Sequence, residues 1–238
     1  AIYRNLTIAL ILLVSTSCGS LKTGGQKEQR VLITTTEGDI KIKLYNETTL
    51  HRDNFRKLVK SKFYDGVLFH RVIDEFMIQA GDPDSKKAEA DARLGSGDVG
   101  YTIPAEFRTP HIYHKKGALA AARTGDNVNP EMRSSGCQFY IVVGKKYTDE
   151  QLDALQRTKI ARYARYGGED ELGYLFNEEA RNDYKTIGGT PNLDGNYTVF
   201  GEVVEGLDIV ERISKTETDR ADRPKEDIRV IKMKLVRK

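Results

Sequence analysis

The sequence predicts a mainly β protein whose sheet closes into an antiparallel barrel. Short apolar segments, some alternating with polar residues, recur from residue 31 to the end and are separated by Gly- and Asp-containing turns. Segments with helical spacing outside one insertion are few, one near residue 50 and one near residue 210. Many short strands with only two helices favour a closed sheet, because closure removes exposed strand edges.

The predicted elements follow in order along the chain. Residues 31–45 fit a hairpin, because apolar residues alternate with lysines beyond the turn at Gly38. Residues 48–61 fit a helix with Phe55, Leu58 and Val59 on one side. Further strands are expected within residues 67–78, 118–143 and 228–235, and a short helix in residues 206–213.

Residues 148–186 show helical patterns inside the predicted β region. Thr148 and Gln151 have the spacing of a capping box, and apolar residues follow at helical offsets up to Tyr163. Gly167 and Gly168 interrupt the pattern, which then resumes and continues to Tyr184. We expect a helical insertion here, which either binds a partner, frames the substrate site or serves the fold alone.

Composition is that of a globular protein without a bias toward nucleic acid. The 238 residues include 38 Lys and Arg and 35 Asp and Glu, and the formal net charge is +3. Charges of both signs are mixed, and no basic stripe with interleaved aromatic residues occurs, so nucleic acid is not an expected partner. The four histidines lack zinc-ligand spacing, and neither a metal nor a cofactor is expected.

The first residues of the chain resemble a targeting segment. The apolar run of residues 6–14 follows Arg4; it is too short to span a bilayer but fits the core of a signal peptide. Small residues before Cys18 resemble a bacterial lipoprotein cleavage site. This predicts a signal peptide at 1–17, a lipidated tether at 18–30, and a membrane-anchored lipoprotein of the cell envelope facing the periplasm. The alternative is an ordinary secretory signal with an incidental cysteine.

One arginine stands out among apolar and aromatic neighbours. If the segment around Arg71 is extended, Phe69, Arg71 and Gln79 share one face. A bend near Asp74 would bring Phe76 back beside Arg71. A lone arginine at such a place is most simply a surface residue of an edge strand, so the segment alone leaves its role open.

Three long motifs occur in a fixed order. They are residues 69–83 around Arg71, the paired segments 117–123 and 135–143, and residues 188–201. Together they resemble the cyclophilin family of peptidyl-prolyl cis-trans isomerases, and the resemblance extends over 31–238 apart from the insertion. It implies an eight-stranded barrel with a helix over each end. It also implies a monomeric isomerase that acts on Pro-containing segments of folding extracytoplasmic proteins; the alternative is a non-catalytic module that binds such segments.

The resemblance implies that Arg71 is catalytic. Rotation about an X–Pro bond is opposed by a barrier of ~18–20 kcal/mol. A permanently charged guanidinium can favour the twisted amide by donating a hydrogen bond to the prolyl nitrogen, without metal or cofactor. The substrate-binding residues implied are His70, Phe76, Met77, Gln79, Gly95, Gly97, Ala122, Arg123, Thr124, Gln138, Tyr140, Leu193 and Tyr197.

The implied roles differ within this set. Gln79 and Gln138 would orient Arg71 or bind the substrate main chain, and the main chain of residues 122–124 would pair with the peptide. His70 either contacts substrate or is a neutral structural imidazole. Asn192 stands where many eukaryotic members have a Trp that contacts cyclosporin, so we expect weak cyclosporin binding. The residues expected to hold the proline ring are Phe76, Met77, Tyr140, Leu193 and Tyr197.

Overall fold

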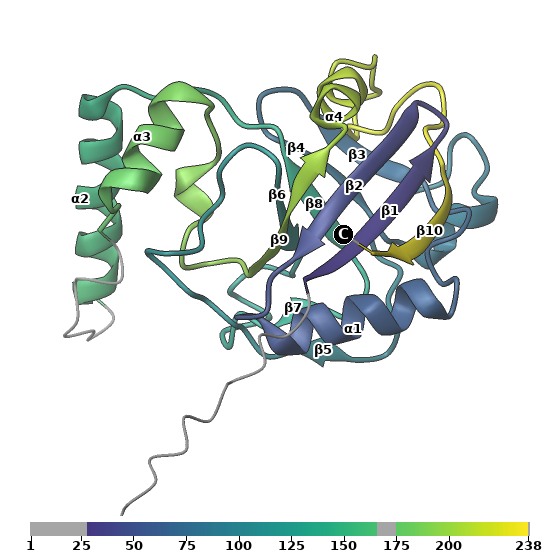
Figure 1. Ribbon diagram of the computed structural model, residues 1–238, viewed down its shortest axis with the longest axis horizontal. Helices are drawn as coiled ribbons and strands as arrows, with labels where there is room; N and C mark the ends of the chain where they lie inside the picture. The colour runs from purple at the N-terminus through teal and green to yellow at the C-terminus, as the bar shows by residue number, and fades with distance from the viewer. Residues whose placement is uncertain (1–27, 166–174, 238) are drawn as a thin grey trace, which may run out of the picture.

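The computed structural model describes residues 28–165 and 175–237 and centres on an eight-stranded antiparallel sheet (Figure 1). The strand order is β10-β1-β2-β9-β6-β8-β4-β3. A separate pair joins β5 (Thr102–Ile103) to β7 (Ser134–Ser135). The strands of the large sheet are β1 (Gln29–Thr35), β2 (Gly38–Leu44), β3 (Phe69–Ile73), β4 (Met77–Ala80), β6 (Ala118–Ala121), β8 (Phe139–Val142), β9 (Val199–Glu205) and β10 (Val230–Val236).

The sheet is open and partly curled, so the prediction of a closed barrel is wrong as stated. Within the described residues its edge strands, β3 and β10, form no ladder with each other. Their first residues still bond to the chain beside the other strand: the Gly66 N–H donates to the Val230 carbonyl at 2.7 Å, and the Phe69 N–H donates to the Ile228 carbonyl at 2.9 Å. Farther along β3, the Val72 N–H donates instead to the carbonyl of Asp222, in a turn before β10 where Thr218 bridges Pro224.

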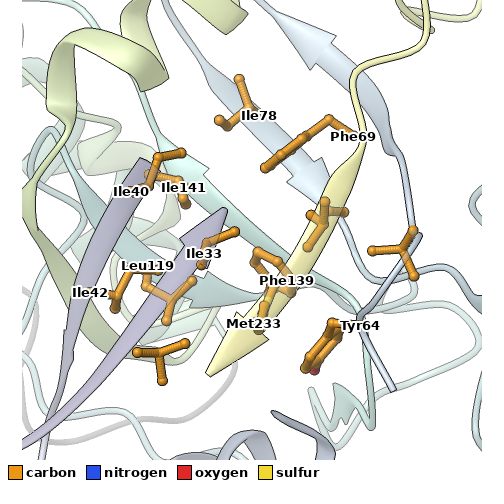
Figure 2. Close-up of a cluster of buried hydrophobic side chains, with 14 of the residues drawn as sticks. Ile33, Ile40, Ile42, Tyr64, Phe69, Ile78, Leu119, Phe139, Ile141 and Met233 are labelled. Carbon is orange, nitrogen blue, oxygen red and sulfur yellow. The ribbon is translucent and has the colours of Figure 1, made fainter. Parts of the chain in front are cut away.

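The curled sheet encloses the main hydrophobic core (Figure 2). Alternation in β8 directs Phe139 and Ile141 into this core, and directs Tyr140 and Val142 to a second apolar cluster on the other face. The largest fully buried side chains of the core include Ile33, Ile40, Ile42, Tyr64, Phe69, Ile78, Leu119 and Phe139.

Two helices cover opposite ends of the sheet, as predicted (Figure 1). They are α1 (Thr49–Lys60), which packs against β10 and β9, and α4 (Leu207–Ser214), which packs against β2, β3 and β4. The carboxylate of Glu106 accepts the backbone N–H groups of Leu50 at 3.2 Å and His51 at 2.9 Å. It thereby caps α1 in place of Thr48, whose side chain makes no cap bond.

The insertion forms two helices beside the sheet, α2 (Asp149–Arg165) and α3 (Glu178–Thr186) (Figure 1). The predicted break at Gly167 and Gly168 lies outside the described residues. Arg181 on α3 pairs with Asp149 on α2 at 2.9 Å. A small apolar cluster of their own, Tyr113, Leu152, Ala180 and Tyr184, joins the two helices to the body.

The N-terminal predictions fall mostly outside the described chain. The predicted signal peptide and Cys18 lie there, whereas β1 begins at Gln29, inside the segment predicted as a tether. Among residues 28–165 and 175–237, no helix has the length and apolar character needed to cross a membrane. The same residues contain no group of three or more His, Cys, Asp or Glu side chains placed to hold a metal ion.

Candidate active site

A groove of about 340 Å³ lies over the second apolar cluster, on the face of the sheet opposite the main core. Three of the predicted groove residues lie outside its lining, namely Gly97, Thr124 and Gln138. Two residues that were not predicted, Leu94 and Ala221, belong to the lining. The full lining is His70, Arg71, Phe76, Met77, Gln79, Leu94, Gly95, Ala122, Arg123, Tyr140, Leu193, Tyr197 and Ala221.

An irregularity in β3 directs Arg71 into the groove. Phe69 pairs with Ala80 and Arg71 with Gln79, so two steps along β3 match one step along β4. Such a bulge re-aims the side chains that follow it. Phe69 therefore packs in the main core while the Arg71 side chain, 43% exposed, lies at the groove. The prediction that Phe69 and Arg71 share a face is wrong for this reason.

A turn from the C-terminal part of the chain faces Arg71. The Arg71 Nε lies 3.5 Å from Asp222 Oδ2, and the Asp222 carbonyl accepts the Val72 N–H at 2.8 Å. Arg223 is 5% exposed and donates to the Glu89 carbonyl at 2.8 Å and to Asp227 at 2.9 Å. The turn is thus fixed beside the guanidinium, and sequence analysis missed it.

Two glutamines and a buried aspartate hold the opposite wall. Gln79 Nε2 donates to Gln138 Oε1 at 3.0 Å, and Gln138 Nε2 donates to the carbonyls of Gly95 at 3.0 Å and Gly97 at 2.8 Å. The Asp82 carboxylate, which is fully buried, accepts the N–H groups of the same two glycines. Sequence analysis missed Asp82 because an aspartate before a proline is typical of an ordinary turn.

His70 is buried under the groove as a neutral imidazole. Its side chain is 4% exposed, and neither ring nitrogen has a hydrogen-bond partner in the described chain. Burial lowers the pKa of His70 to about 4, against the opposing effect of Asp82 and with the help of the Arg71 charge. A Cβ on Gly95 would lie 3.7 Å from the ring, so the imidazole supports that part of the wall.

Arg123 contributes both a side-chain wall and an open backbone edge. Its guanidinium carbon lies 4.6 Å from the centre of the Tyr197 ring, and it pairs with Asp126 at 2.8 Å. Ala122 already uses its N–H on the Gln138 carbonyl at 3.0 Å and its carbonyl on the Ser135 N–H at 2.8 Å. Within residues 28–165 and 175–237, the backbone N–H and carbonyl of Arg123 have no such partner. The backbone groups left open beside the groove therefore belong to Arg123 rather than Ala122.

The floor of the groove is Tyr140, and its hydroxyl is tied to residues that sequence analysis missed. The hydroxyl lies 3.0 Å from His114 Nε2, and His114 Nδ1 lies 2.8 Å from Asp194 Oδ1. Burial raises the pKa of the Tyr140 phenol well above its ordinary value, so the phenol is neutral. The hydroxyl is thus satisfied beneath the groove, and the ring forms the floor.

A larger cavity, about 460 Å³, lies elsewhere, between residues 43–47 and 111–115. Both lysines of its lining pair with Glu202, Lys43 at 2.9 Å and Lys115 at 3.0 Å, and the other Lys or Glu residues of that lining are glutamates. The groove, by contrast, combines an accessible cation with an apolar floor. The groove is therefore the candidate active site.

Comparison with known proteins agrees with this choice. Residues 30–235 match the family model described as cyclophilin type peptidyl-prolyl cis-trans isomerase/CLD. A Staphylococcus aureus protein provisionally named as a peptidyl-prolyl cis-trans isomerase is 32% identical over 204 residues, which cover 85% of this chain and 89% of that protein. A Streptococcus pyogenes protein provisionally named as a bifunctional phosphatase and peptidyl-prolyl cis-trans isomerase is 33% identical, but the chain spans 37% of its length.

A solved structure supports the fold alone. The Cryptosporidium parvum cyclophilin-type peptidyl-prolyl cis-trans isomerase superposes with a TM-score of 0.62 at 21% identity, over 89% of this chain and 99% of that one. The same protein was also crystallised in the presence of the dipeptide Ala-Pro, with a TM-score of 0.58.

Proposed function

The chain belongs to the cyclophilin-type family of peptidyl-prolyl cis-trans isomerases, and we propose that its isomerase activity resides in the groove around Arg71. The observation that carries this proposal is a charged, 43% exposed guanidinium at an apolar cavity. Arginine stays protonated and presents several donors in a fixed fork.

Arg71 acts on the twisted state of the X–Pro amide. In the planar ground state the prolyl nitrogen shares its lone pair with the carbonyl, which creates a barrier of ~18–20 kcal/mol. At the twisted transition state the lone pair returns to the nitrogen, which becomes a hydrogen-bond acceptor. A guanidinium N–H directed at that nitrogen stabilises the transition state more than the ground state, which is the condition for catalysis.

The apolar floor and walls hold the proline ring. Met77 and Tyr140 are 1% and 4% exposed and form the floor, and Phe76, Leu193 and Tyr197 pack beside them at the rim. The proposed ligand is an Ala-Pro or similar segment of a folding chain. The Ala-Pro dipeptide used with the Cryptosporidium relative supports that choice.

The substrate main chain lies along Arg123. Its free N–H and carbonyl would pair with an extended peptide as a strand edge does. Gln79 and Gln138 hold the wall opposite, and the small residue Gly95 leaves room there for the residue before proline.

The clients are proteins that fold outside the cytoplasm. The apolar run of residues 6–14 and the small residues before Cys18 support export and lipidation of Cys18, which would hold the enzyme in the cell envelope facing the periplasm. Lipid on Cys18 is the proposed membrane contact.

The mechanism is tested by Arg71→Ala, with Arg212→Ala on α4 as a matched control. Removing Arg71 should lower kcat/KM on a short Ala-Pro peptide by about 10²-fold or more, the loss typical of a transition-state donor. Arg212 is 57% exposed and away from the groove lining, so its replacement should leave kcat/KM unchanged.

Circular dichroism and thermal melting would verify that both variants fold. An Arg71→Ala protein within a few-fold of wild type would refute the proposed mechanism. An inactive wild type that still binds the peptide would favour the non-catalytic module.

A further inference from the structure

Both helices of the insertion hold one turn of the groove. This turn, residues 190–194, carries Leu193, which lines the groove. From α2, Lys159 Nζ donates to the Asn192 carbonyl at 3.2 Å and to the Asp194 carbonyl at 2.5 Å. From α3, the Tyr184 hydroxyl donates to Asp194 Oδ2 at 2.5 Å. Leu193 is therefore placed between two residues that the insertion fixes.

The contact from α3 continues to the groove floor. Asp194 Oδ1 accepts both the backbone N–H and the ring Nδ1–H of His114, each at 2.8 Å. On the other side of the ring, His114 Nε2 lies 3.0 Å from the Tyr140 hydroxyl, within hydrogen-bond distance. The His114 and Tyr140 rings are stacked, with an interplanar angle of 13°. A continuous line of hydrogen bonds thus runs from Tyr184 to Tyr140.

The members of this line are all shielded from water. Tyr184 is 0%, His114 1%, Asp194 4% and Tyr140 4% exposed. In such surroundings a lost partner is not replaced by solvent, and each bond constrains the orientation of the next group. The orientation of the Tyr140 ring and the position of Leu193 therefore depend on Asp194, which α3 holds through a single phenol.

We propose that the insertion is a working part of the isomerase site, and that Tyr184 is a positioning residue that sets the fit of the proline pocket. This inference rests on the proposed function of the groove. Tyr184 does not touch substrate; it fixes Asp194, and through it the Leu193 wall and the Tyr140 floor. The pocket wall and floor hold the ring equally in planar and twisted states, so Tyr184 governs KM rather than kcat.

Tyr184→Phe tests the proposal, because it removes the hydroxyl and keeps the ring that packs on Tyr113, Tyr147 and Phe176. We expect KM for a short Ala-Pro peptide to rise about fivefold, as for the loss of one buried hydrogen bond. We expect kcat to change less than about twofold. Lys185→Gln is the matched control: it lies next to Tyr184 on α3, pairs with Asp149 at 2.9 Å, and should leave KM unchanged.

A double-mutant cycle separates positioning from general destabilisation. If Tyr184 acts through the line to Tyr140, the combined Tyr184→Phe and Tyr140→Phe change should raise KM less than the product of the single changes. An unchanged KM in Tyr184→Phe, or full multiplicativity in the cycle, would overturn the proposal.

A second variant keeps the test open if Tyr184→Phe fails to fold. Lys159→Met removes the contact that α2 makes with the same turn, and a wild-type KM in that variant would equally overturn the proposal. Loss of the proposed function would appear separately, as an activity insensitive to Arg71→Ala.

Discussion

Two neighbouring residues, His70 and Arg71, differ in whether the folded protein leaves them charged. His70 is 4% exposed and gives up its charge, since burial lowers its pKa to about 4. Arg71 cannot lose its proton, and the β3 bulge leaves its side chain 43% exposed at the groove. Of these two neighbours, Arg71 is therefore the one that supplies a charge to the groove.

The neutral state of His70 predicts a pH-dependent stability. In the unfolded chain His70 takes up a proton near its ordinary pKa of about 6.5, whereas in the folded chain it does so only near pH 4. The stability is therefore complete above about pH 6.5 and falls as the pH drops toward 4, by up to about 3 kcal/mol. Burial likewise lowers the pKa of His51, against the opposing effect of Glu106, and adds to the fall.

Urea unfolding between pH 4 and pH 7 measures this effect. His70→Gln should flatten the dependence of the unfolding free energy on pH over that range, while His111→Gln, at an exposed histidine, should not. Equal slopes in wild type and His70→Gln would show that His70 is charged when folded.

At the residue scale, most side chains that line the groove could be predicted from the sequence, but few of the residues that hydrogen-bond to the lining could. Arg71, Phe76, Tyr140 and Tyr197 were predicted because they stand in continuous motifs. Asp82, Asp194 and Asp222 were missed, since a turn aspartate has the same local sequence whether it bonds its own turn or a distant segment. Their contacts arise only when the chain has folded.

Among the elements, the loop of residues 94–97, which forms part of the groove wall, has no space for a larger side chain at Gly97. A Cβ on Gly97 would lie 2.1 Å from Asp82 Oδ1, although the backbone there is of an ordinary type. Gly97→Ala must therefore displace either the loop or the buried carboxylate. We expect a loss of about 1–3 kcal/mol in the free energy of unfolding, as for other overpacked sites, and a lower kcat/KM because Leu94 and Gly95 move.

Gly125→Ala is the comparison for this change. The nearest atom to its Cβ would be Asn127 Oδ1 at 3.8 Å, so the unfolding free energy should stay near that of wild type. Thermal melting of the two variants measures the difference, and equal melting temperatures would mean that the 94–97 loop adjusts freely.

Elements with a clear period were predicted closely, and irregular ones were not. The helix expected at 48–61 is α1, and that expected at 206–213 is α4. The bulge of β3 was not foreseen, because a one-residue irregularity leaves no trace in an alternating pattern. Nor was the gap between β3 and β10, since the alternation within each strand does not show over what length two strands distant in the sequence will pair.

At the scale of the whole molecule, the described residues that line the groove all follow the first strand. The groove lining runs from His70 to Ala221, and the first strand begins at Gln29. Arg30 pairs with Val236 on β10 and with Lys43 on β2, so residues 29 and 30 belong to the sheet, and the groove residues that the structure describes follow them. If the N-terminal segment anchors the protein in a membrane, as proposed, anchoring and isomerisation should be separable.

This separation predicts the outcome of Cys18→Ser. If Cys18 carries lipid, each buried methylene contributes ~0.8 kcal/mol to membrane binding, and its loss should move the protein to the soluble fraction or leave it unprocessed. The isomerase activity of the released protein should equal that of wild type, because residue 18 precedes the first strand, which begins at Gln29, and every groove residue. Detergent phase partitioning measures membrane binding, and mass spectrometry of the N-terminal peptide of the same sample measures the modification of Cys18. Ser17→Ala, which keeps a small residue before the cysteine, is the control and should stay in the detergent phase. An unmodified Cys18 in mature protein would instead identify an ordinary secretory signal.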